Sequence, residues 1–183
     1  MRTKKTLVVN LFAGPSTGKS STMAGLFSEL KWRGLDCEMA PEFAKEKVWE
    51  ESKKILSNQI YVFGKQLHTI HRVMGKVDCV ITDSPLLLSL IYGKNQVPSF
   101  EGLVTEVFNQ QWSLNIFLKR LKKFNPNGRL QNEEQAKQID RDILAMLKRK
   151  EVDFIEIDSK PDSTILLADM VQETIGKDKF KYS

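Results

Sequence analysis

The sequence predicts an α/β fold: a doubly wound sheet of five parallel strands with helices on both faces. Over its 183 residues, short apolar runs alternate with longer segments in which apolar residues recur at helical spacing. Strands and helices that alternate in this way form parallel sheets with right-handed crossovers. One run, residues 77–83, is largely apolar and ends in an acid, which suits a parallel strand that is buried on both faces.

The first part of the chain begins with an expected strand at residues 6–12, and a helix follows at 19–33. In that helix Met, Leu and Phe recur at helical spacing. Gly34 is expected to end it, because glycine readily takes the left-handed conformation found after helices. A second strand is expected at 35–40, after which Pro41 turns the chain.

The middle of the chain is predicted to be mostly helical. A charged segment at 44–54 and a longer amphipathic segment at 57–75 precede the buried strand at 77–83. Pro85 favours the start of a short helix at 86–92, because proline is well tolerated at a helix N-terminus.

A polar connection leads to an expected helix near 101–110 and a fourth strand at 112–118. The next segment, 119–131, has no apolar periodicity and contains the turn signal N-P-N-G-R, so it is predicted to be a loop. Asn132 can cap the following helix, 133–150, by accepting a backbone hydrogen bond with its side chain.

The last elements are a strand at 152–157 and a helix at 161–175, which Gly176 is expected to end. No internal repeat, low-complexity segment or linker divides the chain. With 41% hydrophobic residues, this length suits a single domain over residues 1–183.

Charge and cysteine content narrow the class of protein. The chain has 28 Lys and Arg against 23 Asp and Glu, a net charge of +5, which fits a polyanionic ligand without distinguishing a nucleotide from DNA. Cys37 and Cys79 lie in apolar segments without a Cys-x-x-Cys motif, so we expect reduced core thiols on adjacent strands. Without a recognisable signal peptide or spanning stretch, we expect a cytoplasmic protein with no membrane contact and make no prediction of its oligomeric state.

The segment 13–20, A-G-P-S-T-G-K-S, stands between the first strand and the first helix and has the form of a phosphate-binding P-loop. Its two glycines let backbone N–H groups converge on phosphate oxygens, and the helix N-terminus favours an anion. Lys19 adds a charge for the β- and γ-phosphates of ATP, and Ser20 adds an oxygen for Mg²⁺. The residues expected to hold the triphosphate are Gly14, Pro15, Ser16, Thr17, Gly18, Lys19, Ser20 and Ser21.

One departure from the P-loop pattern is Ala13, which stands where the pattern has glycine. Alanine is small and serves there if its backbone conformation is ordinary. The alternative interpretation of the segment is a turn rich in Gly, Ser and Thr that binds nothing. The position between strand and helix favours triphosphate binding.

Two acids follow expected strands, and ligands of open α/β sheets bind at the carboxyl ends of strands. Asp83 is a candidate Mg²⁺ ligand together with Ser20, and Glu42 is a candidate for orienting the hydroxyl of a phosphate acceptor. The two roles are interchangeable at this point, and each acid has the alternative interpretation of a helix cap. Phosphate transfer also needs positive charge, which Arg120 and Arg129 in the 119–131 loop would supply as a lid. The alternative for that loop is a solvated basic surface.

The expected 57–75 helix carries two further polar features. His68 and His71 stand one turn apart, but without Cys or Asp partners they are more typical of a helix surface or core than of a metal site. Gln66 is a candidate for reading a base edge with its amide group.

Taken together, four segments resemble the P-loop kinases of nucleosides and nucleotides, and in particular the group related to nicotinamide riboside kinase, many of them encoded by bacteriophages. The resemblance spans nearly the whole chain: A-G-P-S-T-G-K-S at 13–20, A-P-E-F-A-K at 40–45, I-T-D-S-P at 81–85, and L-K-R followed by N-P-N-G-R within 118–129. It implies a P-loop kinase fold that binds ATP and Mg²⁺, with Glu42 and Asp83 beside the transferred phosphate and Arg120 and Arg129 in a lid.

The acceptor stays open at this stage. The leading hypothesis is a kinase for a nucleoside- or nucleotide-like small molecule. Related phage kinases also imply a second hypothesis, phosphorylation of hydroxymethylated pyrimidines as nucleotides or within DNA. A third hypothesis, from another class, is a nucleotide-gated ATPase or binding module that acts through a partner.

Overall fold

Five strands form one sheet in the computed structural model of the chain, which describes residues 4–93, 96–121, 123–127 and 131–180. Neighbouring strands are all parallel, and their order is β2-β3-β1-β4-β5. The strands are β1 (Leu7–Phe12), β2 (Cys37–Ala40), β3 (Cys79–Thr82), β4 (Ser113–Lys119) and β5 (Ile155–Asp158). The five-stranded parallel sheet predicted from the sequence is confirmed, and β1, which leads into the predicted P-loop, lies at its centre.

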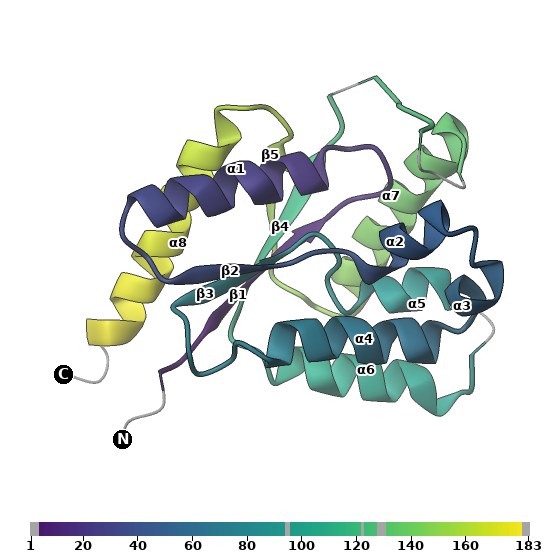
Figure 1. Ribbon diagram of the computed structural model, residues 1–183, viewed down its shortest axis with the longest axis horizontal. Helices are drawn as coiled ribbons and strands as arrows, with labels where there is room; N and C mark the ends of the chain where they lie inside the picture. The colour runs from purple at the N-terminus through teal and green to yellow at the C-terminus, as the bar shows by residue number, and fades with distance from the viewer. Residues whose placement is uncertain (1–3, 94–95, 122, 128–130, 181–183) are drawn as a thin grey trace.

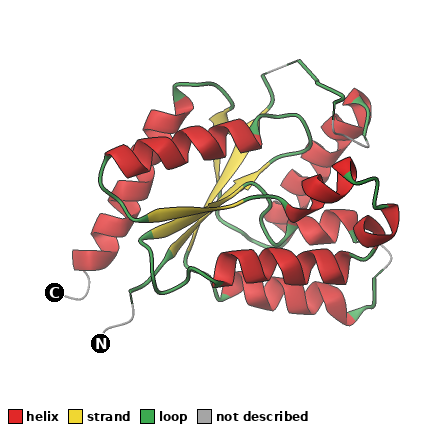
Figure 2. Cartoon of the chain, in the orientation of Figure 1, coloured by secondary structure: helices red, strands yellow, loops and turns green. Residues whose placement is uncertain are grey.

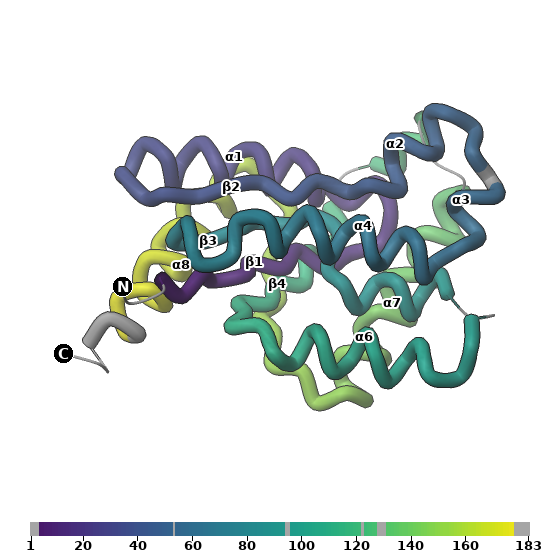
Figure 3. The backbone as a smooth tube through the Cα atoms, turned by 60° about the horizontal axis from the view of Figure 1, so that its bottom comes forward, coloured from purple at the N-terminus to yellow at the C-terminus, as the bar shows by residue number. Residues whose placement is uncertain are grey.

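Helices cover both faces of the sheet (Figure 1, Figure 2). One face carries α1 (Lys19–Trp32) and α8 (Ser163–Phe180), and the other carries α4 (Gln59–His71), α5 (Leu88–Tyr92), α6 (Ser99–Asn109) and α7 (Glu133–Arg149). Two short helices, α2 (Phe43–Trp49) and α3 (Lys53–Ser57), follow the carboxyl end of β2 at the end of the molecule where β1 passes into α1 (Figure 3). Within the described residues, no helix has both the length and the hydropathy needed to cross a bilayer.

β1 is buried on both sides because its side chains alternate between two apolar cores. Leu7, Val9 and Leu11 belong to the core under α1 and α8, whereas Val8 and Phe12 belong to the core under α4 to α7. All five side chains are 0% exposed. Full burial of such a side chain stabilises the fold by about 1.5–3 kcal/mol, so the strand before the P-loop is anchored from both faces.

The two cysteines are register partners on adjacent strands. Cys37 of β2 lies opposite Cys79 of β3, and both are buried free thiols. The hydrogen bond between them and then burial raise the pKa of the Cys79 thiol. The predicted core position of both thiols is confirmed.

The sequence signals at two helix ends are also confirmed. Gly34 has a φ of +80° after α1, and the Leu35 N–H donates to the Leu30 carbonyl over 3.0 Å, so glycine supplies the left-handed turn that closes the helix. At the start of α7, the Asn132 side chain accepts from the Gln135 N–H, and the Gln135 side chain accepts from the Asn132 N–H, each over 2.9 Å. This capping box fixes where the 119–131 loop gives way to helix.

The helix predicted over 44–54 is wrong, because the chain forms α2 and α3 with a turn between them. Glu51 adopts a φ of +55°, and the Ser52 N–H donates to the Lys47 carbonyl over 2.9 Å. A glutamate here takes the left-handed position that usually signals glycine, so the sequence carries no visible stop signal. No residue of α2 is buried, and this short helix therefore lacks the packing that would hold one long helix straight.

The end predicted for the last helix at Gly176 is also wrong, because α8 continues to Phe180. Glycine inside a helix costs only about 1 kcal/mol relative to alanine. Neighbouring residues offset that cost: Ile175 packs into the core at 7% exposure, and Lys177 pairs with Glu173 one turn earlier.

Candidate active site

The P-loop segment wraps around the N-terminus of α1. Gly18 is the residue before the helix and has a φ of +112°, a conformation that requires glycine. Ser16 also lies in the left-handed region, with a φ of +61°. The Thr17 hydroxyl donates to the Gly14 carbonyl over 3.0 Å, which closes the loop on itself. Among the residues that the structure describes, no side chain caps the N-terminus of α1, so the first amides of this 14-residue helix remain available to an anion.

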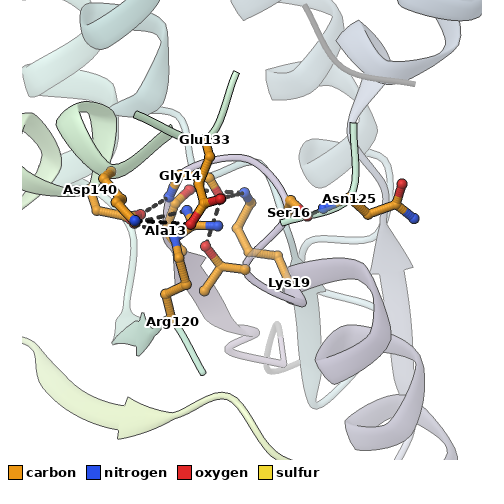
Figure 4. Close-up of polar contacts among 10 residues, drawn as sticks. Ala13, Gly14, Ser16, Lys19, Arg120, Asn125, Glu133 and Asp140 are labelled. Carbon is orange, nitrogen blue, oxygen red and sulfur yellow. Dashed lines mark hydrogen bonds and ion pairs between the residues drawn. The ribbon is translucent and has the colours of Figure 1, made fainter. Parts of the chain in front are cut away.

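Gly14 is required for a different reason, which is its contact with α7. Its N–H donates to Asp140 Oδ1 over 2.6 Å (Figure 4). A Cβ added at Gly14 would lie 2.7 Å from both the Ala136 carbonyl oxygen and Asp140 Oδ1. Gly14 therefore lets α7 approach the loop from the side.

Arg120 completes this contact from the end of β4. Its Nε and Nη2 donate to Asp140 Oδ2 over 2.9 and 2.8 Å, and the two side chains are only 12% and 17% exposed. The third nitrogen, Nη1, is buried without a hydrogen-bond partner among the described residues. We call Gly14, Arg120 and Asp140 the α7 anchor, because together they join the P-loop, the base of the 119–131 loop and α7.

The electrostatic surroundings of the anchor include Glu133 on the first turn of α7 (Figure 4). A hydrogen bond from Lys137 lowers the pKa of the Glu133 carboxyl, and Arg120 lowers this pKa further. Glu133 is therefore an anion at neutral pH, and it partly balances the guanidinium of Arg120.

The side chain of Lys19 points toward the start of the P-loop. Its ammonium donates to the carbonyl oxygens of Ala13 and Gly14 over 2.8 and 2.9 Å (Figure 4). These bonds hold the charge at the loop. Phosphate oxygens bound in the loop would compete with these carbonyls for the ammonium.

Asp83 connects the P-loop to the turn after β2. It is 2% exposed, its Oδ2 accepts from the Ser20 hydroxyl over 2.6 Å, and its Oδ1 accepts from the Glu42 N–H over 2.9 Å. A serine hydroxyl beside a buried carboxylate is a donor set of hard oxygens, which fits Mg²⁺ bound jointly with phosphate oxygens. The structure thus brings together Ser20, Asp83 and Glu42 from three separate segments.

A cavity of about 330 Å³ opens from the P-loop between α2, α3, α4 and α5. Glu42 lines it, together with P-loop residues 15–21 and Gln131 from the far end of the 119–131 loop. The remaining lining residues are the apolar Ala44, Val48, Leu56, Val62 and Leu88, the polar Gln59, Ser84, Ser89 and Tyr92, and Lys45. One end of the cavity is therefore built for phosphate, and the other end has a largely apolar wall with a few polar groups.

Gln66, on the α2 and α4 side of the site, differs from the sequence interpretation. Gln66 is 3% exposed, and its amide bonds the Phe43 N–H, the Ala40 carbonyl and the Thr82 hydroxyl over 3.1–3.2 Å. Because these contacts occupy its carbonyl and its NH₂ group, the hypothesis that it reads a base edge is wrong. His68 and His71 are exposed on α4.

The described part of the 119–131 loop reaches the P-loop. The Asn125 N–H donates to the Ser16 hydroxyl over 2.8 Å (Figure 4). Arg129, the expected lid arginine, lies outside the described residues. Arg120 lies at the base of the loop, in the α7 anchor.

Sequence reasoning missed two residues of this site. Asp140 lies inside a helix with an ordinary amphipathic pattern, and only the fold brings it to Gly14. Lys45 is visible in the sequence as part of A-P-E-F-A-K, three residues after Glu42. That spacing puts both on one side of a helix start and is a signal that could have identified it.

Comparison with known proteins supports this description of the fold. A family model described as an AAA domain matches residues 8–162. A structure of deoxyadenosine kinase from M. mycoides, with the products dCMP and a flexible dCDP bound, is 18% identical and has a TM-score of 0.52. A second structure of that enzyme, with dATP bound, is 15% identical and has a TM-score of 0.55. Each match covers 92% of this chain and 99% of the other. No curated protein sequence matches the chain.

Proposed function

The chain belongs to the AAA domain family, and on that premise we propose that it is an ATP- and Mg²⁺-dependent kinase. It transfers the γ-phosphate of ATP to a nucleoside- or nucleotide-like acceptor. The observation that carries this proposal is the hydrogen-bonded series from Ser20 through Asp83 to Glu42, which leads from the P-loop into the 330 Å³ cavity. A loop that only bound or hydrolysed ATP would not need an acceptor cavity beside it.

Residues 14–21 bind the triphosphate in this proposal. The open amides at the start of α1 contact phosphate oxygens, and Lys19 exchanges its carbonyl partners for the β- and γ-phosphates. Ser20 and Asp83 would hold Mg²⁺, which when bound would offset the negative charge of the phosphate oxygens. The 2.6 Å contact between these two side chains supports assigning the metal to Asp83.

Glu42 orients the acceptor. The Glu42 N–H is held by Asp83, and Glu42 lines the cavity. Its carboxylate is therefore suited to accept a hydrogen bond from an acceptor hydroxyl. Arg120 and Arg129 supply positive charge to the transferred phosphate. For Arg120 the supporting observation is its buried Nη1 beside the P-loop, whereas Arg129 keeps its role from sequence reasoning alone.

The choice of acceptor class has support from two directions. The fold is that of a deoxyadenosine kinase described with dATP, dCMP and dCDP, and the sequence resembles the group related to nicotinamide riboside kinase, with its phage-encoded members. Both directions favour a nucleoside or nucleotide.

The test is a phosphate-transfer assay with γ-labelled ATP and Mg²⁺ against nucleosides, mononucleotides and DNA that contains hydroxymethyluracil. We expect transfer to a nucleoside or mononucleotide, and Lys19→Ala should lower it by about 100-fold or more. Lys31→Ala is the matched control, because Lys31 lies in the last turn of the same helix and outside the cavity. Transfer that survives Lys19→Ala contradicts the proposal, and ATP hydrolysis without any transfer indicates an ATPase or binding module.

A further inference from the structure

Lys45 is a cation in the cavity wall whose charge is not balanced by the described part of the protein. It lies on the first turn of α2, is partly buried and lines the cavity. Among the described residues it forms no hydrogen bond or ion pair. A lysine that is partly removed from water without a partner loses solvation without gaining a counter-charge.

Two other lysines near Lys45, Lys47 and Lys19, do have partners. Lys47, on the same helix, donates to Glu50 over 2.7 Å and lies outside the cavity lining. Lys19, on the P-loop, donates to two carbonyl oxygens over 2.8 and 2.9 Å. Of the two lysines that line the cavity, Lys19 has partners, whereas Lys45 has none among the described residues and faces the space where a ligand would bind. Perturbed or unpaired charges in a cleft are typical of functional sites, where the ligand supplies the counter-charge.

The position of Lys45 separates it from the machinery assigned to ATP. The triphosphate has its own partners in residues 14–21, whereas Lys45 belongs to α2, three residues after the proposed acceptor-orienting Glu42. Residues three apart on a helix are neighbours, so one molecule can meet both side chains. The carboxylate of Glu42 calls for a hydroxyl donor, and the ammonium of Lys45 calls for an anion.

The rest of the wall suits a largely apolar group. Val48 follows Lys45 along α2, and Leu56, Val62 and Leu88 complete the apolar lining. The cavity volume of about 330 Å³ is within the range of small-molecule sites. The acceptor that matches these features has a largely apolar group, a hydroxyl and an anionic group, and under the proposed kinase function the apolar group is a nucleobase.

We propose that Lys45 binds a phosphate of the acceptor and that the acceptor is a nucleoside monophosphate rather than an uncharged nucleoside. This inference rests on the proposed kinase function and narrows its substrate class. An oxygen of the monophosphate forms the new bond to the γ-phosphorus, and ADP leaves with the electron pair of the broken P–O bond. An attacking phosphate oxygen has no proton to lose when ionised, and an attacking hydroxyl gives its proton to Glu42.

The experiment compares matched pairs of acceptors, each nucleoside against its own 5′-monophosphate, in the wild type, Lys45→Gln and Lys47→Gln. The wild type should prefer the monophosphate of each pair. Lys45→Gln should lower kcat/KM for monophosphates by about 10- to 100-fold, the effect expected when a charge-assisted hydrogen bond is lost. It should leave the KM for ATP and the activity with nucleosides within about twofold. Lys47→Gln should match the wild type in every assay, and Lys45→Arg should restore monophosphate activity.

Other outcomes overturn the inference in distinguishable ways. A raised KM for ATP in Lys45→Gln would mean that the lysine binds the γ-phosphate of ATP and not the acceptor. If the wild type prefers nucleosides to their monophosphates, the acceptor carries no phosphate, although the kinase function stands. If the wild type phosphorylates DNA but no mononucleotide, the acceptor is a nucleic acid and not a nucleoside monophosphate. If the wild type transfers phosphate to none of the acceptors, the kinase function fails. The role of Lys45 is then tested by calorimetry, which compares the affinity of the wild type and of Lys45→Gln for a nucleoside monophosphate. Equal affinities in that measurement contradict its role, whereas weaker binding to Lys45→Gln supports it.

Discussion

The phosphate end and the acceptor end of the cavity are built differently. At the phosphate end, Asp140 holds Gly14 and Arg120, and Asp83 holds Ser20 and the backbone of Glu42, all over 2.6–2.9 Å. At the acceptor end, α2 and α3 are short, no residue of α2 is buried, and Lys45 has no partner among the described residues. The difference teaches that the protein holds the phosphate end in a fixed geometry through its own hydrogen bonds. At the acceptor end, the positive charge of Lys45 is left for the acceptor to balance.

The largest expected effect comes from breaking the α7 anchor. Asp140→Ala should lower the free energy of unfolding by about 3 kcal/mol, because it leaves Arg120 and the Gly14 N–H buried without a partner. Chemical denaturation with urea measures this change. Asp142→Ala on the same helix is the control and should cost far less. A loss below about 1 kcal/mol for Asp140→Ala would show that the phosphate end does not depend on α7.

The next effect concerns catalysis at the same end. Asp83→Asn keeps the size of the side chain and an oxygen that can accept from Ser20 or Glu42, but it removes the charge that would hold Mg²⁺. We expect kcat to fall by about 100-fold while the melting temperature changes little. Steady-state kinetics over a Mg²⁺ titration checks this, because a metal ligand also shifts the Mg²⁺ dependence. Asp36→Asn, on an exposed loop, is a suitable control.

A smaller effect should separate the acceptor end from the phosphate end. Val48→Ala removes two methyl groups from the cavity wall, and about 1 kcal/mol of acceptor binding should be lost. The KM for the acceptor should rise about fivefold at an unchanged KM for ATP. Trp49→Ala, next to it and 65% exposed, is the control. Equal changes in both KM values would mean that the two ends are not independent.

The smallest effect should come from the ion pair on α2. Lys47 is 17% exposed and pairs with Glu50, which is 52% exposed. A partly exposed pair contributes at most about 1 kcal/mol, so Lys47→Ala should change the free energy of unfolding by less than that and leave the transfer rate unchanged within error. Denaturation and the transfer assay measure the two quantities. A large change in either would show that α2 depends on its surface charges, and Lys47 would then no longer serve as a control for Lys45.

The features that the sequence predicted are those encoded by neighbouring residues. The P-loop is one contiguous segment, and the Gly34 turn and the Asn132 cap each depend on a few adjacent positions. The central strand was visible as an apolar run, and every residue of β1 is buried. Local patterns are enough for such features, since their hydrogen bonds close within one turn of chain.

The features that the sequence did not reveal depend on contacts made after folding. Glu51 takes a left-handed turn that its residue type does not announce, and Gly176 stays helical because Ile175 packs in the core. Asp140 is 126 positions from Gly14, so no window of sequence shows that they meet. Gln66 resembled a ligand residue until the fold placed Ala40 and Thr82 around its amide.

The α7 anchor also constrains how this protein can diverge. Gly14 and Arg120 are far apart in the chain, yet both bond to Asp140, so a change at Asp140 leaves the other two without their partner. Homologues with a neutral residue at position 140 should therefore also lack arginine at 120. An alignment of family members would show this dependence as covariation between the positions.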